Sequence, residues 1–368
     1  MNLCRILGAC VKWVLLALVT VEVLSFLIIS ISNYLIFNQI REGSPAIYDP
    51  YALFLLPGGP RPTAHNAATP AGPNHRVIWM FGGSTTRGAT DYDDRTIPSY
   101  LAGILNQSGR QASFTLVNFG VDSFNSLLET KYFQKELIEN PQIPDLVIFY
   151  DGANDSTYFP QYRTPYGHLG YRRMRALVEG YHNSFFGLLK PLNAALYSSF
   201  TKELYDKSRQ ALVPLEPDSE SLRQNVTETL QRYRHVQKIA GCYGAHFLLL
   251  WQPYLWAETG QVAPQVKRQE ENNFIILGLR FTTLRHNFTV TYQALKDRLR
   301  PEPYFVDFQN VLCNRTQPVY QPDGIHLLDE GRLMVARAMS PVLEERGLVA
   351  PAPRPIAFEE CADVTDAG

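Results

Sequence analysis

The chain has 368 residues, 45% of them hydrophobic, and its 34 Lys and Arg nearly balance 35 Asp and Glu, for a formal net charge of -1. This length can bury the core of one large α/β domain or of two small ones. Nucleic-acid binding needs Lys and Arg concentrated on one face, and no basic tract is present. We therefore expect no nucleic-acid partner.

The cysteines fit no metal-binding or redox spacing. They are Cys4, Cys10, Cys242, Cys313 and Cys361. Either they are scattered unpaired thiols, or Cys313 pairs with Cys361 or Cys242 in an oxidising compartment. The pair with Cys242 is the less expected, because Cys242 should end a helix below the sheet whereas Cys313 follows a strand at its top. The histidines other than His326 form no metal-spaced cluster, so we expect no metal and no cofactor.

Residues 13–37 are almost continuously apolar and long enough to cross a hydrocarbon core of roughly 30 Å. Arg5 and Lys12 precede this run, whereas the charges just after it balance, so residues 1–12 are predicted to be cytoplasmic. A cleaved signal peptide is the alternative, but the run exceeds a usual h-region and no small-x-small cleavage site follows it. We expect a single-pass signal anchor with the rest of the chain on the periplasmic or extracellular side.

Glu22 lies inside this span. A charge there costs on the order of 3 kcal/mol on insertion scales. Two interpretations remain open: Glu22 faces a membrane partner helix, or it is a protonated or tolerated carboxyl in a very apolar helix.

Residues 38–75 are rich in proline among Gly, Ala, Asn and Thr, a composition that resists helix and favours an extended tether. Residues 48–56 within it are apolar enough to pack on the following domain as an added edge segment. The last residues, 347–368, carry several prolines and few apolar side chains, and we expect a disordered tail.

Strands and helices alternate between these ends, over residues 76–346. Strands are predicted at 77–80, 114–119, 144–150, 246–251 and 304–308, and helices at 97–107, 126–139, 220–242, 265–298 and 329–346. Residues 156–218 break this rhythm, and we interpret them as an aromatic-rich insertion. The alternation predicts a parallel five-stranded sheet with helices on both faces. Ligands of such sheets bind beyond the carboxyl ends of the strands.

Polar residues follow four of the predicted strands at that edge. Ser84 follows the first strand, and Asp323 and His326 follow the fifth. A serine hydroxyl needs a base to become a nucleophile, and His326 suits this role because its ordinary pKa is near operating pH. Asp323, three residues before His326, can hold the imidazole in the required tautomer.

The residues after the second and third strands suit an oxyanion hole, which needs fixed hydrogen-bond donors. We assign it the backbone N–H groups of Ser84 and Gly120 and the side-chain amide of Asn154. Arg87 follows the nucleophile closely enough to reach the pocket and is a possible substrate-binding residue.

Four segments, in this order, resemble the sequence blocks of the SGNH, or GDSL-like, hydrolases, in particular their membrane-anchored bacterial members. They are Gly82-Gly83-Ser84-Thr85-Thr86, Asn118-Phe119-Gly120, Asp151-Gly152-Ala153-Asn154-Asp155 and Asp323-Gly324-Ile325-His326. The resemblance implies a flavodoxin-like three-layer α/β/α sandwich, a Ser84–His326–Asp323 triad and an oxyanion hole of Ser84, Gly120 and Asn154. Gly83 replaces the Asp of a Gly-Asp-Ser-Leu motif, a departure that keeps the nucleophile but questions a lipase assignment.

The expected function is hydrolysis of O-acyl groups, O-acetyl above all, on a small molecule or an extracytoplasmic glycan, by way of a serine acyl-enzyme. An O-acyltransferase that uses the same residues is one alternative, and a non-catalytic glycan-binding or assembly component is another. The aromatic side chains of residues 156–218 either contact the substrate or pack a core of their own.

Overall fold

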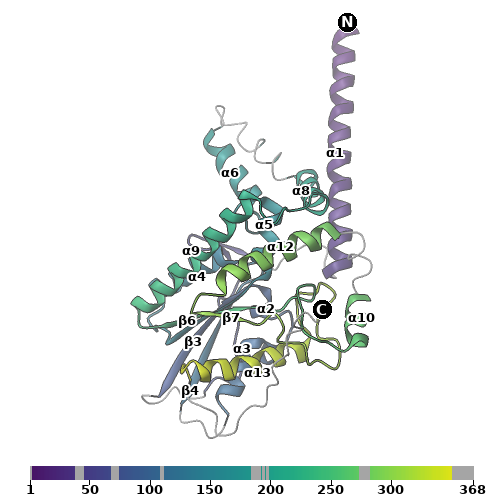
Figure 1. The fold of residues 1–368 in the computed structure, drawn as a ribbon. Helices are drawn as coiled ribbons and strands as arrows, with labels where there is room; N and C mark the ends of the chain where they lie inside the picture. The colour runs from purple at the N-terminus through teal and green to yellow at the C-terminus, as the bar shows by residue number, and fades with distance from the viewer. Residues whose placement is uncertain are drawn as a thin grey trace. The chain divides into compact units, whose positions relative to one another are not determined.

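The computed structural model describes residues 2–37, 45–67, 74–107, 112–183, 199–272 and 282–349, together with residues 192 and 195. The chain divides into two compact units (Figure 1). The sheet unit consists of Gly43–Leu169 and Leu215–Gly368. The helical unit consists of Met1–Glu42 and Gly170–Pro214.

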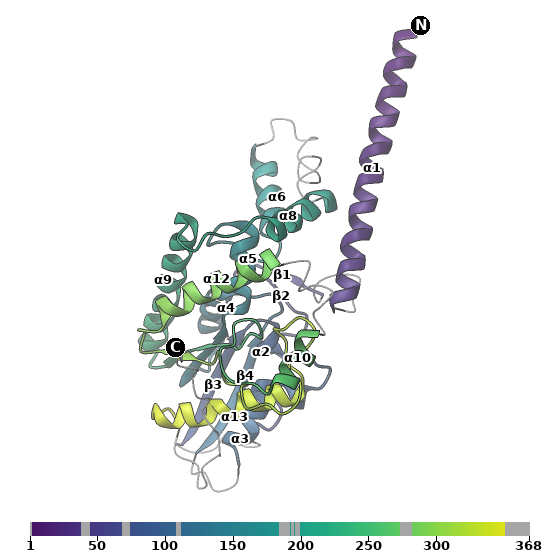
Figure 2. The same ribbon diagram turned by 45° about the vertical axis from the view of Figure 1, so that its right-hand side comes forward.

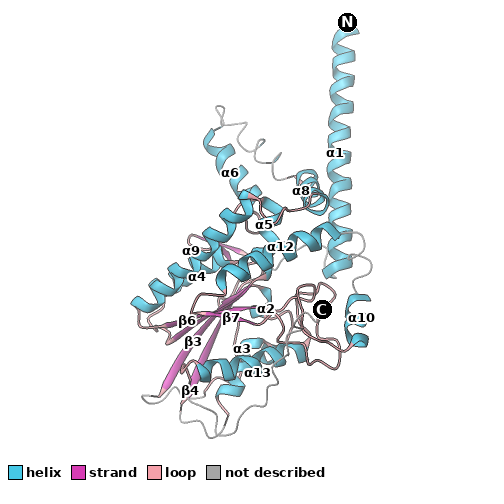
Figure 3. Ribbon diagram, in the orientation of Figure 1, coloured by secondary structure: helices cyan, strands magenta, loops and turns pink. Residues whose placement is uncertain are grey.

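A five-stranded parallel sheet in the order β4-β3-β5-β6-β7 forms the centre of the sheet unit (Figure 3). Its strands are β3 (His75–Gly82), β4 (Ser113–Gly120), β5 (Leu146–Asp151), β6 (His246–Trp251) and β7 (Phe305–Asp307). Every residue of β5 is buried, as expected for a strand covered on both faces. Gly82 pairs with Gly120 on one side and with Tyr150 on the other, which aligns the carboxyl ends of three strands. The predicted parallel sheet is confirmed.

Helices cover both faces of this sheet (Figures 1 and 2). The helices α4 (Ser126–Glu139), α9 (Glu220–Cys242) and α12 (Thr282–Leu299) pack on one face, and α3 (Ile97–Leu105) and α13 (Asp329–Glu345) pack on the other. Shorter helices lie at α2 (Ser84–Arg87), η1 (Asp93–Arg95), α5 (Ala153–Tyr162) and α10 (Pro264–Asn272). The sheet unit is thus the expected three-layer α/β/α sandwich.

Local signals set the start of α3. The Thr96 hydroxyl accepts a hydrogen bond from the Ser99 N–H, and Pro98 lies in the first turn. The bounds of α4 and α9 match the predicted helices. The long helical region predicted at 265–298 contains two described helices, α10 and α12, and residues 273–281 between them lie outside the described part.

Residues 45–67 pack on the sheet unit. The strands β1 (Ile47–Asp49) and β2 (Leu53–Leu55) pair with each other as an antiparallel hairpin, outside the main sheet. The Arg61 N–H instead donates to the Asn118 carbonyl at 3.1 Å, and the Ala67 N–H donates to the Phe114 carbonyl at 3.2 Å. Edge-strand groups need partners, and residues 61–67 supply them to β4. Residues 48–56 do pack on the domain as predicted, with Ala52 and Leu55 in its core, but they form a separate hairpin, and residues 61–67 lie along the edge of the sheet.

The helical unit contains α1 (Asn2–Phe37), α6 (Tyr171–Asn183) and α8 (Phe200–Leu212). Over Ile6–Tyr34, α1 is long and apolar enough to cross a bilayer. The expected insertion at 156–218 is divided, because residues up to Leu169 belong to the sheet unit and Gly170–Pro214 group with α1.

The cysteines separate into bonded and free thiols. Cys313 is disulfide-bonded, whereas Cys10 and Cys242 are free. The pair of Cys313 with Cys242, rated the less expected, does not form. Beyond Val349 the expected tail lies outside the described residues, as do residues 38–44 of the expected tether.

Candidate active site

Two glycines shape the turn that presents Ser84 at the end of β3. A Cβ on Gly82 would lie 2.0 Å from Thr86 Oγ1, and a Cβ on Gly83 would lie 2.2 Å from Asn154 Nδ2. Neither position has room for a side chain. The Arg87 N–H donates to the Gly83 carbonyl at 3.0 Å and closes the turn into α2. Ser84 is therefore held at the carboxyl edge of the sheet by a turn that needs both glycines.

A chain of hydrogen bonds joins Ser84, His326 and Asp323. Ser84 Oγ lies 2.6 Å from His326 Nε2, and His326 Nδ1 bonds to Asp323 Oδ2. Asp323 Oδ1 accepts the N–H groups of Ile325 and His326, each at 2.9 Å. The carboxylate is fixed by its own loop, and the imidazole lies between it and the hydroxyl. This arrangement suits the activation of a serine by a base.

Electrostatics favour an ionised Asp323 next to a basic imidazole. Burial by itself would raise the pKa of Asp323, but the charge of His326 and the hydrogen bonds lower it below the ordinary value. Burial by itself would lower the pKa of His326, but the charge of Asp323 and the hydrogen bond between them raise it above the ordinary value. Each partner therefore stabilises the charged form of the other.

The loop that carries Asp323 and His326 closes on itself. The Gln321 N–H donates to the His326 carbonyl at 2.8 Å, and the Gly324 N–H donates back to the Gln321 carbonyl at 3.0 Å. Gly324 has a φ of 67°, in the region that favours glycine. A bridge between Tyr320 and Leu327 pairs the two ends of the loop.

A buried ion cluster braces the start of this loop. Arg315 donates to both oxygens of Glu258, at 2.9 and 2.8 Å, and to Glu270 Oε2 at 3.0 and 2.6 Å. The Tyr320 hydroxyl donates to Glu258, and Glu270 accepts the Val319 N–H, each at 2.8 Å. The Arg315 side chain is fully buried, so the cluster connects α10 to the catalytic loop inside the protein.

We expect the substitution Arg315→Met to lower the free energy of unfolding by about 3 to 5 kcal/mol, because it leaves two buried carboxylates without their cation. Chemical denaturation of the full chain in detergent measures this change. Arg300→Met is the control, since Arg300 is 63% exposed and lies 3.9 Å from Asp307, a pair worth about 1 kcal/mol or less. Equal effects of the two substitutions would show that the buried cluster adds no stability.

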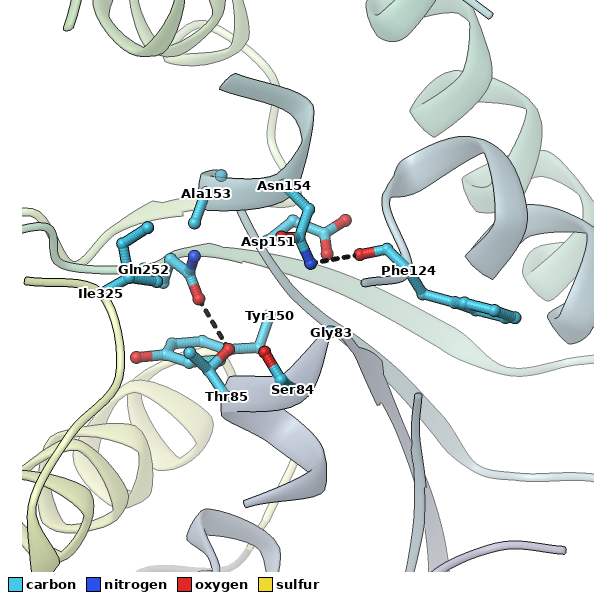
Figure 4. A pocket seen from close by; sticks show the side chains of 11 residues that line it. Gly83, Ser84, Thr85, Phe124, Tyr150, Asp151, Ala153, Asn154, Gln252 and Ile325 are labelled. Carbon is cyan, nitrogen blue, oxygen red and sulfur yellow. Dashed lines mark hydrogen bonds between the residues drawn. The ribbon is translucent and has the colours of Figure 1, made fainter. Parts of the chain in front are cut away.

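The donors expected to form the oxyanion hole differ in whether they are already hydrogen-bonded to another group of the protein. Asn154 Nδ2 lies over the Ser84 turn and also donates to the Phe124 carbonyl at 2.6 Å (Figure 4). The Gly120 N–H donates to Asn118 Oδ1 at 3.0 Å, and a Cβ on Gly120 would lie 2.2 Å from the Arg87 backbone nitrogen. Gly120 thus allows α2 to pack closely on β4. The N–H that the sequence analysis assigned to the oxyanion hole is already used by the Asn118 side chain.

Ser123, in the loop after β4, is a donor that the sequence analysis missed. Its φ of 65° lies in the left-handed region, and within the described residues its N–H donates to no other group. The next residue, Phe124, accepts the hydrogen bond from Asn154. A serine with a positive φ, three residues beyond the end of β4, leaves little signal in the sequence.

A pocket lies beside Ser84 (Figure 4). It is lined by Gly83, Ser84, Thr85, Phe124, Tyr150, Asp151, Gly152, Ala153, Asn154, Gln252 and Ile325. All of these residues belong to the sheet unit.

Gln252 is a pocket residue that the sequence analysis did not name. Its Oε1 accepts the Thr85 hydroxyl at 2.8 Å, and its side chain is buried. Gln252 directly follows β6, at the carboxyl edge of the sheet. The rule that ligands bind at this edge would have identified it.

Two buried carboxyl groups, of Asp151 and Glu129, lie at the pocket. Asp151 lines the pocket and accepts the Tyr233 hydroxyl at 2.8 Å, and Glu129 is fully buried next to it. Burial, and then the neighbouring charge, raises the pKa of Glu129 well above its ordinary value. Burial next to Asp151 therefore favours the protonated form of Glu129.

Arg87 forms an ion pair with Asp122, whose Oδ2 lies 2.6 Å from the guanidinium. Both side chains are partly exposed, at 31% and 20%. Asp122 also contributes to the electrostatics of the triad, because its negative charge helps to raise the pKa of His326.

This coupling predicts a pH shift. A His326 that acts as the base for Ser84 must be neutral, so kcat/KM should rise with pH through a pKa above the ordinary histidine value of about 6.5. Asp122→Asn removes a negative charge that favours the imidazolium, and the acid limb should move to lower pH. The exposed carboxylate of Asp94 provides the control, since Asp94→Asn should leave the profile unchanged. An unmoved limb in Asp122→Asn would disprove the coupling.

Comparison with known proteins found no matching family model and no matching curated protein. Solved structures do resemble the chain. A lipase/acylhydrolase from Enterococcus faecalis is 14% identical with a TM-score of 0.41, over 76% of this chain and 100% of that one. The acetylxylan esterase Axe2 from Geobacillus stearothermophilus is 16% identical with a TM-score of 0.37, over 76% and 97%. A carbohydrate acetylesterase family member from Sinorhizobium meliloti is 15% identical with a TM-score of 0.36, over 73% and 98%.

These neighbours are ester hydrolases. At such low identity, what this chain does has to be argued from the geometry of its own site. Within the described residues, no group of three or more His, Cys, Asp or Glu side chains is placed to hold a metal ion.

Proposed function

We propose that the protein is a membrane-anchored serine ester hydrolase with Ser84 as its nucleophile. The single observation that supports this most is the hydrogen-bonded chain Ser84–His326–Asp323 at the mouth of a pocket. Ser84 and His326 are 242 positions apart in the sequence, and the hydrogen bond between them supports this proposal.

In the proposed mechanism, His326 Nε2 takes the proton of Ser84 Oγ as the oxygen attacks the acyl carbon. Asp323 steadies the imidazolium through Nδ1, and His326 then gives the proton to the leaving alcohol. In the second half of the reaction, His326 takes a proton from a water molecule as the water attacks the acyl-enzyme. The acid leaves as Ser84 Oγ takes the proton back from His326. Throughout, Asp323 stays ionised, which its lowered pKa favours.

The proposed oxyanion hole consists of three donors around the Ser84 turn. The first donor is the backbone N–H of Ser84, the first residue of α2, and the second is Asn154 Nδ2, which lies next to Gly83. The third donor is the backbone N–H of Ser123, in place of the backbone N–H of Gly120. Each such donor is typically worth about 3 kcal/mol of transition-state stabilisation.

The pocket favours a short acyl group. Asp151 and Gln252 place polar atoms in its wall. A long hydrocarbon chain would desolvate these groups without offering them a hydrogen bond. We therefore propose O-acetyl groups as the substrate, carried by a glycan outside the cytoplasm. The disulfide at Cys313 and the apolar helix α1 support a catalytic unit on the oxidising side of a membrane.

Acyl length tests this assignment. We expect p-nitrophenyl acetate to be hydrolysed with a kcat/KM higher than that of p-nitrophenyl octanoate by about 10-fold or more, because the longer chain does not fit the polar pocket. Steady-state kinetics of the full chain in detergent give both values. Equal or reversed preference would indicate a lipase-like site instead, and no Ser84-dependent hydrolysis of either ester would refute the esterase.

A further inference from the structure

Glu22, inside the apolar helix α1, binds the start of α8. Its carboxyl oxygens accept the Phe200 N–H at 2.6 Å, the Thr201 N–H at 3.0 Å and the Thr201 hydroxyl at 2.7 Å. The first N–H groups of a helix have no partner within the helix, and a carboxyl group is a strong cap for them. Glu22 is therefore the N-terminal cap of α8.

Side-chain packing extends this contact along α1. Ser25 Oγ lies 3.3 Å from Thr201 Oγ1, and the rings of Phe26 and Phe200 meet edge to face with their centroids 5.0 Å apart. Figures 1 and 2 both show α8 beside α1. The contact involves successive turns of α1 and belongs to one compact unit.

The position of Glu22 places this contact deep in the bilayer. Lys12 and Tyr34, which suit the two membrane surfaces, lie ten residues before and twelve residues after Glu22. At 1.5 Å per residue these separations are about 15 and 18 Å, so Glu22 is near the centre of a hydrocarbon core of roughly 30 Å.

The two sides of α1 at this level also differ in exposure. Ser25, Ile29 and Asn33 are 4 to 6% exposed. Leu24 and Ile28, on the same turns, are each 52% exposed and are large and apolar, so lipid must cover them. Phe200 and Thr201, which contact Phe26 and Ser25, therefore lie at the same depth as the lipid that covers Leu24 and Ile28.

The contact meets two needs at once. A carboxyl in hydrocarbon needs hydrogen-bond donors, and a helix that begins in hydrocarbon needs acceptors for its first N–H groups. Glu22 and α8 satisfy each other. This also answers the question that the sequence left open, because the partner helix of Glu22 comes from the same chain.

The four charged side chains of α8 that the structure describes are paired, as an intramembrane position requires. Its ion pairs within the helical unit are Arg173–Glu203, Arg172–Asp206, Lys202–Asp206 and Lys207–Glu203. On α6, Leu177 and Val178 are 49% and 59% exposed. The sequence that joins α6 to α8 adds further apolar residues, among them Phe185, Phe186, Leu188 and Leu189.

We infer that α6 and α8 form a re-entrant membrane segment, docked on α1 through Glu22, and that its exposed apolar side chains contact lipid hydrocarbon. Two segments of the chain then lie in the bilayer: the membrane span α1 and the re-entrant segment formed by α6 and α8. The helices α6 and α8 then serve membrane attachment.

Spin labelling of the full chain in phosphatidylcholine vesicles tests this inference. A nitroxide is attached at Val178→Cys, in a background whose cysteines outside the disulfide are serine. Collisions with oxygen, which concentrates in lipid, are compared with collisions with a water-soluble nickel chelate. Ile28→Cys on α1 gives the lipid reference, and Tyr243→Cys, 48% exposed at the end of α9, gives the water reference. The label at Val178 should match Ile28, and a match to Tyr243 would overturn the inference.

The role of Glu22 is tested on the same label. Glu22→Leu should shift the collision ratio at Val178 toward the water reference, because α8 loses its cap and its hold on α1. Thr20→Leu is the matched control, since Thr20 is exposed and its hydroxyl bonds only the Leu16 carbonyl of its own helix. An unchanged ratio in Glu22→Leu would show that Glu22 does not dock the segment. Neither measurement depends on ester hydrolysis.

Discussion

Replacing Ser84 with alanine is expected to lower kcat/KM for p-nitrophenyl acetate by about 10⁴-fold or more. The variant has no hydroxyl to form the acyl-enzyme, and only the oxyanion donors and the pocket remain to assist direct attack by water. The change removes one partly buried oxygen and should leave the fold intact, which circular dichroism of the same sample verifies.

Ser113→Ala is the matched control for this experiment. Ser113 lies at the amino end of β4, the opposite edge of the sheet, and its hydroxyl bonds His75 at 2.9 Å. It should keep the activity of the unmodified chain. If Ser84→Ala retains a tenth of that activity or more, the nucleophile is a different group.

The substitution Asp323→Asn is expected to lower kcat/KM by about 10⁴-fold, although its side chain has nearly the same shape. Asp323 accepts a hydrogen bond from the protonated Nδ1 of His326, and Nε2 is then free to take the proton of Ser84. An asparagine amide can donate to Nδ1, and the imidazole then carries its proton on Nε2, where it cannot act as a base. The remaining activity should also lose its acid limb near the raised pKa of His326.

Kinetics across a pH series measure both effects. Asp297→Asn, which neutralises an exposed carboxylate on α12, is the control and should change neither rate nor profile. Full activity in Asp323→Asn would mean that the hydrogen bond between Asp323 and His326 is only structural.

Much of the sheet unit was predictable from local patterns. The five parallel strands appear in the sequence as short apolar runs, because a strand covered on both faces has no polar side. The positions of Ser84, Asp323 and His326 followed from the rule that polar residues after parallel strands meet at one edge. Their hydrogen bonds then depend on the closed loop 321–326 and on Arg315, and neither feature was identified from the sequence.

The donors of the oxyanion hole were harder to predict because their availability depends on tertiary contacts. Gly120 looked suitable by its place after β4. The side chain of Asn118, two residues before it, folds back and accepts that N–H. No periodicity or composition reveals such a bond. Gln252, by contrast, follows β6, so the rule that polar residues after parallel strands meet at one edge predicts its place in the site.

The segments outside the alternating pattern were the least predictable. Residues 48–56 are apolar enough for an edge segment, but residues 61–67 have the backbone groups that reach β4. The aromatic content of 156–218 indicated packing without showing the partner. Glu22 was recognised as unusual, and its partner, 178 residues away at Phe200, is apparent only in three dimensions.

The identity of the nucleophile is tested most directly by covalent labelling. The full chain is treated with a fluorophosphonate, which forms a stable bond to an activated serine oxygen, and its peptides are analysed by mass spectrometry. We predict one phosphonyl group, on the peptide that contains Ser84, with loss of ester hydrolysis in proportion to labelling and no label on His326→Ala. Loss of activity while Ser84 stays unmodified, or a label on another serine, would contradict the proposed catalytic site.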